Sequence, residues 1–79
     1  MIEEELRKET LKWLERIEAE KSNIIAKKSN EDFMRNIEAY IADSRYFLNK
    51  SDLIRAFEAV VWAWAWLEIG LRLNVLSRK

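Results

Sequence analysis

The sequence predicts an all-α fold, an up-down-up bundle of three helices, and three observations support this prediction. Apolar residues recur at helical spacing along three segments of the chain. The chain has one glycine and no proline, which leaves few of the turn signals that sandwiches and barrels of strands require. The connection over residues 49–52 is short, so the second and third helices are expected to run antiparallel. We therefore expect a single helical domain over residues 1–79, with helices at about 2–22, 30–49 and 52–76.

The first helix is predicted by a stripe of apolar residues behind an acidic start. Three glutamates at positions 3–5 suit a helix N-terminus, where negative charge is favourable. The stripe consists of Ile2, Leu6, Trp13, Leu14 and Ile17. Residues 21–30 then form the first connection, with serine and asparagine near both of its ends. Ile24 and Ile25 in this connection are expected to tuck under the bundle.

The second helix begins near Asn30 and has one clear inner face. Glu31 and Asp32 occupy its first turn. The residues of the inner face are Phe33, Ile37, Ile41, Ser44 and Leu48. Residues 49–52, Asn-Lys-Ser-Asp, are too few for anything but a tight turn between two helices. Ser51 or Asp52 is the expected N-cap of the third helix.

The third helix has more apolar surface than a bundle of three helices requires. Its core stripe consists of Leu53, Ala56, Phe57, Val60, Trp64, Leu67 and Leu71. A second stripe lies roughly opposite the first and consists of Trp62, Trp66, Ile69 and Leu73. Glu58, Glu68 and Arg72 lie between the two stripes, and small residues line the other flank. A helix on the outside of a bundle needs only one apolar stripe.

The second stripe predicts an interaction surface, with residues Trp62, Trp66, Ile69 and Leu73 as the interface. Self-association into a dimer or a dimer of dimers is the economical interpretation, because a two-fold axis pairs the patch with itself. Two alternatives remain open. A long first helix wraps further round and buries part of the stripe, or a different protein or a small apolar ligand binds there.

Catalysis has little support in the sequence. The only candidate polar cluster is Tyr40, Asp43 and Glu68, in which a carboxylate near a tyrosine would act as acid or base. The competing interpretation is structural: Asp43 bonds to a neighbouring helix, and Glu68 forms a surface pair with Arg72. A minimal enzyme is therefore the third hypothesis. We assign no catalytic, cofactor-binding or metal-ligating residue and expect no cofactor.

Composition excludes several other classes of function. The chain has neither cysteine nor histidine, which removes thiolate zinc sites and the commonest general base. Fourteen basic and fourteen acidic residues give a net charge of zero, which argues against nucleic acid or a membrane surface as partner. The longest apolar run, residues 59–67, is nine residues long, whereas a spanning helix needs about 20. The acidic N-terminus does not resemble a signal peptide. We expect a cytoplasmic protein.

From Tyr40 onward the sequence carries a pattern of aromatic, acidic and small residues. The positions that carry it are Tyr40, Asp43, Phe47, Leu48, Lys50, Ser51, Asp52, Ala56, Phe57, Ala63, Leu67, Glu68 and Gly70. At these positions the chain resembles domain-of-unknown-function family 357, a family of small archaeal proteins. The first helix matches only loosely. Ser51 stands where the family's turn carries glycine, and Glu68 where it carries aspartate. The resemblance implies a closed up-and-down three-helix bundle and no established activity.

Overall fold

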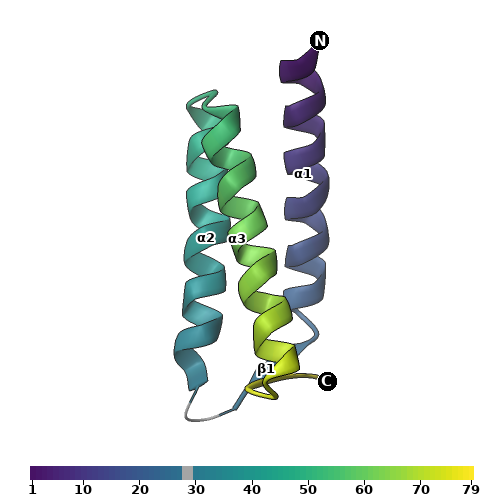
Figure 1. The fold of residues 1–79 in the computed structure, drawn as a ribbon, viewed down its shortest axis with the longest axis vertical. Coiled ribbons are helices and arrows are strands. Elements are labelled where there is room, and N and C mark those ends of the chain that lie inside the picture. Colours follow the sequence, from purple (N-terminus) through teal and green to yellow (C-terminus); the bar gives the residue numbers. More distant parts are fainter. Residues whose placement is uncertain (28–29) are drawn as a thin grey trace.

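The structure consists of three helices, of which consecutive ones run antiparallel, and a two-stranded sheet. It is a computed structural model and describes residues 1–27 and 30–79. The helices run up, down and up along a body of 43 × 17 × 17 Å, and Figure 1 shows α3 between α2 and α1 in this view. This arrangement confirms the predicted fold class. The elements in chain order are α1 (Ile2–Lys21), β1 (Ile24–Ala26), α2 (Glu31–Asn49), α3 (Leu53–Arg72) and β2 (Leu76–Arg78).

The turn between α2 and α3 forms as the sequence predicts. Asp52 is the N-cap of α3, and its side chain accepts a hydrogen bond from the Arg55 backbone N–H at 3.3 Å. Ser51 precedes it with a φ of 58°, in the left-handed region that glycine adopts more easily. The turn is tight because the Asp52 N–H also donates to the Phe47 carbonyl oxygen at 2.8 Å.

The core lies where the inner faces of the three helices meet. The buried apolar residues are Leu14, Ile17, Ile24, Ile37, Ile41, Leu48, Ala56, Ala59, Val60, Ala63, Leu67 and Leu76. The predicted core members Phe33, Phe57, Trp64 and Leu71 are partly buried and pack against this cluster. The predicted core stripes of α2 and α3 are therefore confirmed. The flank of small residues on α3 is also buried, which brings the neighbouring backbone close.

Two buried hydroxyl groups have partners within the bundle. The Ser44 Oγ donates to the Ala56 carbonyl oxygen at 2.7 Å and so joins α2 to α3. The Thr10 Oγ1 donates to the Leu6 carbonyl oxygen at 2.8 Å, one turn earlier in α1. Both residues are fully buried, and a hydroxyl group buried without a partner would destabilise the fold.

The end of the chain departs from the prediction. A third helix to residue 76 is wrong, because α3 ends at Arg72 and Asn74 adopts a φ of 61° that turns the backbone aside. The chain then pairs antiparallel with β1, with Ile25 opposite Ser77. This small sheet closes one end of the bundle (Figure 1). Ile24 is buried beneath the helices as expected, whereas Ile25 is 49% exposed. Residues 28–29 of the predicted connection lie outside the described residues.

Candidate interaction face on α3

The outer face of α3 presents large apolar side chains to solvent. Val61, Trp62, Ile69 and Leu73 are 48%, 52%, 47% and 63% exposed. At 100° per residue these side chains fall within an arc of about 120° on the helix. We define the outer face of α3 by these four residues, by Ala65 at the centre of the arc, and by the charged residues Glu58, Glu68 and Arg72.

α2 covers one edge of this face. The rings of Trp66 and Phe33 meet edge to face, with centroids 5.0 Å apart and planes at 73°. Trp66 therefore packs against the core and does not lie on the open surface, which corrects the expectation that it joins the exposed stripe. Trp62 stacks on Tyr40, with centroids 6.3 Å apart and planes at 21°, yet half of its surface stays exposed.

α1 covers the opposite edge through a pair of indoles. Trp13 and Trp64 meet edge to face with centroids 5.7 Å apart. The Trp64 Nε1 donates to the Trp13 carbonyl oxygen at 3.1 Å. α1 thus covers the flank of α3 that carries Trp64 and leaves the outer face open. The alternative in which α1 wraps round and buries part of the second stripe is wrong, because Trp66, the partly buried member of that stripe, packs against Phe33 of α2.

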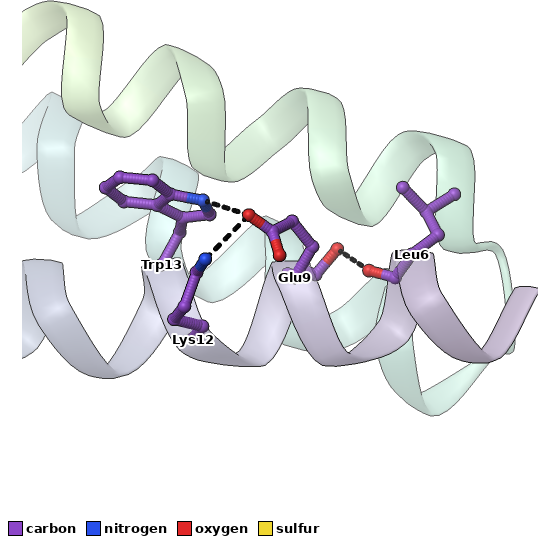
Figure 2. Close-up of polar contacts among 5 residues, drawn as sticks. Leu6, Glu9, Lys12 and Trp13 are labelled. Carbon is purple, nitrogen blue, oxygen red and sulfur yellow. Dashed lines mark hydrogen bonds and ion pairs between the residues drawn. The ribbon is translucent and has the colours of Figure 1, made fainter. Parts of the chain in front are cut away.

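A carboxylate on α1 fixes the Trp13 ring. The Glu9 Oε1 accepts hydrogen bonds from the Trp13 Nε1 at 3.1 Å and from the Lys12 Nζ at 2.8 Å (Figure 2). These two donors, Lys12 first and Trp13 second, lower the pKa of Glu9 below its ordinary value of 4.5. Lys12 and Arg16 also lie near the Trp13 ring, at 5.3 and 5.0 Å from its centroid. Trp13 is thereby held in the orientation that receives Trp64.

The charged residues of the outer face have no ion-pair partner within the described part of the chain. Glu58, Glu68 and Arg72 are exposed, and the predicted pair between Glu68 and Arg72 does not form. Elsewhere charged residues form ion pairs that join two elements, as Glu18 does with Arg45 and Glu20 with Arg78. The outer face therefore keeps both signs of charge available to a partner.

The candidate polar cluster does not form. Tyr40 stacks on Trp62 at the edge of α3 that faces α2, whereas Glu68 borders the hollow beside Trp13 and Trp64. Asp43 is exposed and has no hydrogen bond or ion pair among the described residues, so the expected bond to a neighbouring helix is wrong. Tyr40 and Glu68 lie on different sides of α3, so the three groups do not converge on one substrate, and the hypothesis of an enzyme at this cluster loses its geometric basis.

Residues 1–27 and 30–79 also contain no cluster of side chains that could bind a metal ion. No three carboxylates there approach closely enough to hold a metal ion. Nor does any helix in this part of the chain combine the length and the apolar character needed to cross a membrane.

Sequence reasoning missed a groove at the other end of the bundle. It lies between the first two turns of α1 and the start of α3, where Leu6, Leu53 and Phe57 form an apolar floor. Ile2 and Ile54 flank this floor and are 77% and 74% exposed. The sequence signal was present, since the stripe of α1 begins at Ile2, but a helical wheel does not show that α1 stands away from α3 at this end.

The fold and the open face of α3 define a small three-helix bundle with an unpartnered helical surface. The chain belongs to a family of proteins of unknown function, DUF357, whose model matches residues 4–76. It is similar to the crystal structure of protein AF1782 from the archaeon Archaeoglobus fulgidus, a member of the same family. The two chains share 66% sequence identity and a TM-score of 0.93, with 100% of each chain covered. Comparison with curated proteins found no match.

Proposed function

We propose that the protein is a small cytoplasmic interaction module that self-associates through the outer face of α3, as a dimer or as a dimer of dimers. One observation carries the proposal: four large apolar side chains, each about half exposed, lie together on that face. Contiguous apolar patches on a soluble protein usually mark an interaction site. The neighbouring helices cover both edges of α3 and leave this arc free.

The energetics favour a weak complex. Full burial of one large apolar side chain contributes about 1.5–3 kcal/mol, and these side chains already bury about half of their surface in the monomer. A two-fold axis doubles the number of buried side chains. Association costs about 4–15 kcal/mol in lost translational and rotational freedom, so the net free energy of association is small. Measurements must therefore extend to high micromolar concentrations.

Sedimentation equilibrium tests the proposal directly. The native protein should reach at least twice the chain mass of 9.5 kDa. Ile69→Glu places a charge on the outer face and should yield a folded monomer, with its helical circular dichroism unchanged. Trp66→Glu is unsuitable for this purpose, because Trp66 packs against Phe33 and its loss would disturb the core.

Ile25→Glu is the matched control. Ile25 has the same side chain and nearly the same exposed fraction, 49% against 47% for Ile69, but it lies on β1. Its substitution should leave self-association unchanged. A native protein that stays monomeric at high micromolar concentration contradicts the proposal. The occupant of the face would then be a different protein or a small apolar ligand.

A further inference from the structure

The outer face of α3 has a chemical symmetry about Ala65. Glu58 and Arg72 each lie seven residues from Ala65, on opposite sides along the helix. Val61 and Ile69 each lie four residues from it. We infer that two copies of this chain pair antiparallel through α3, with the two-fold axis passing beside Ala65. This inference rests on the proposed self-association and specifies its geometry.

An antiparallel pair brings together residues at equal distances before and after the axis. Glu58 then faces Arg72 of the partner subunit, about 10 Å along the helix from the axis. Val61 faces Ile69 of the partner subunit, so that apolar side chains meet between the ion pairs. The two-fold axis makes each contact twice. Acid therefore meets base, and apolar meets apolar, along this register.

The next pair of positions is also complementary. Trp62 and Glu68 each lie three residues from Ala65. Trp62 therefore faces Glu68 of the partner subunit, which places an indole N–H donor opposite a carboxylate acceptor. Among the described residues the Trp62 Nε1 makes no hydrogen bond, whereas the Nε1 atoms of Trp13 and Trp64 both do. The second copy supplies the acceptor that the single chain does not.

Other arrangements of the same two helices are less favourable. A parallel pair places Glu58 beside Glu58 of the partner subunit and Arg72 beside Arg72 of the partner subunit, so that like charges repel. Sliding the antiparallel pair by three residues in one direction places Glu58 opposite Ile69 of the partner subunit. Sliding it by four residues in the other direction carries Glu58 past the partner's helix, which ends at residue 72.

Ala65 suits the position on the axis. It lies at the centre of the outer face, it is half-buried, and its side chain ends at Cβ. A small residue at the point where two helices cross lets their backbones approach closely. Larger side chains flank it on both sides, at Val61 and Ile69, and enclose the crossing point. Glu58 and Arg72 lie further out, where charged rim contacts set the register more than the affinity.

A cysteine at the axis tests the geometry, because the chain contains no cysteine of its own. Two Cα atoms must lie within about 7 Å for a disulfide to form. Ala65→Cys should therefore cross-link most of the protein into a covalent dimer under mild oxidation. Glu58→Cys is the control on the same face, since in an antiparallel pair its two copies would lie about 21 Å apart along the direction of the helices. Cross-linking of both variants would indicate a parallel pair and overturn the inference.

Charge reversal gives an independent measure of the register. Glu58→Arg and Arg72→Glu should each weaken the dimer about tenfold, because attraction becomes repulsion at two symmetric contacts. The double variant E58R/R72E should recover to within about threefold of the native dissociation constant. A double variant no tighter than the single ones overturns the antiparallel register while self-association stands. A monomeric native protein overturns both.

Discussion

The Leu76 side chain occupies the space that a β-carbon on Gly70 would need. That atom would lie 2.5 Å from the Leu76 Cδ1, 2.7 Å from its Cγ and 3.2 Å from the Phe33 Cδ1. Leu76 follows the turn at Asn74, so the folded-back chain end lies directly over the last part of α3. The single glycine of the chain thus marks the place where the end of the chain packs against a helix.

Gly70→Ala should destabilise the protein, by up to about 2 kcal/mol. Alanine gains about 1 kcal/mol in helix propensity, but forcing a methyl group into this contact costs about 1–3 kcal/mol or more, because Leu76 is only 1% exposed and has little room to move. Chemical denaturation measures the change. In a Leu76→Ala background the two closest contacts are absent and only the contact with the Phe33 Cδ1 at 3.2 Å remains, so Gly70→Ala should then be less destabilising than in the native background. A stabilising effect in the native background would contradict this contact between Gly70 and Leu76.

Ser51→Gly should stabilise the protein by about 1 kcal/mol. The φ of 58° at Ser51 costs a non-glycine residue about 1–2 kcal/mol, and the gain is reduced because glycine is more flexible in the unfolded chain. The substitution also removes a weak, exposed hydrogen bond from the Arg7 side chain at 3.4 Å. Ser51→Ala separates the two effects, because it removes the hydroxyl group and keeps the backbone strain. If Gly and Ala at this position give equal denaturation midpoints, strain at the turn is not the cause.

Ser44→Ala should destabilise the protein by about 1 kcal/mol. The substitution removes a hydrogen bond buried between α2 and α3, and a typical bond of this kind contributes about 0.5–1.5 kcal/mol. Ser22→Ala is the matched control, since its Oγ also donates to a backbone carbonyl oxygen at 2.7 Å but is exposed. Thermal unfolding should show the larger loss at position 44. Equal losses would show that burial of the Ser44 contact adds nothing.

The helical part of the fold follows from apolar spacing. On α2 the buried residues Ile37, Ile41 and Leu48 repeat at helical intervals, and each lies on the predicted inner face. The cap at Asp52 was predictable for a similar reason, because its role depends on residues three positions away in the chain. Local patterns of this kind need no knowledge of the neighbouring helices.

Contacts between distant segments were harder to predict. The pairing of residues 24–26 with 76–78 joins two three-residue segments, which are too short to show a strand period. The angle of Trp66 on the helix was predicted, but its indole is long enough to reach Phe33 on α2 and so leaves the open face. Asp43 shows the opposite case, because its carboxylate is exposed and forms no hydrogen bond or ion pair among the described residues. The angle of a residue on a helical wheel gives the direction of its side chain from the axis of its own helix. It does not give the positions of the other two helices.

Removal of the Lys12 charge should raise the pKa of Glu9. The Lys12 ammonium is the first cause of the lowered pKa and the Trp13 indole the second, so Lys12→Met should move the pKa back toward 4.5 without restoring it fully. The side-chain carboxyl carbon of Glu9 reports this pKa in an NMR titration. Lys8→Met is the control, since Lys8 precedes Glu9 in the chain but forms no ion pair with its carboxylate, and its loss should change the titration much less.

The same contact sets the sign of a pH effect on stability. The folded-state pKa of Glu9 lies below its value in the unfolded chain, so at a pH between the two the unfolded chain binds the additional proton. The stabilisation is therefore present above about pH 4.5 and is lost as the pH falls through the folded-state pKa. Lys12→Met should reduce this loss relative to the native protein, and added salt should reduce the difference between the two, because both side chains are nearly half exposed. Chemical denaturation at several pH values between 7 and 3 gives the free energy of unfolding of each protein. If this free energy decreases equally with falling pH in Lys12→Met and in the native protein, the contact between Glu9 and Lys12 does not contribute to stability.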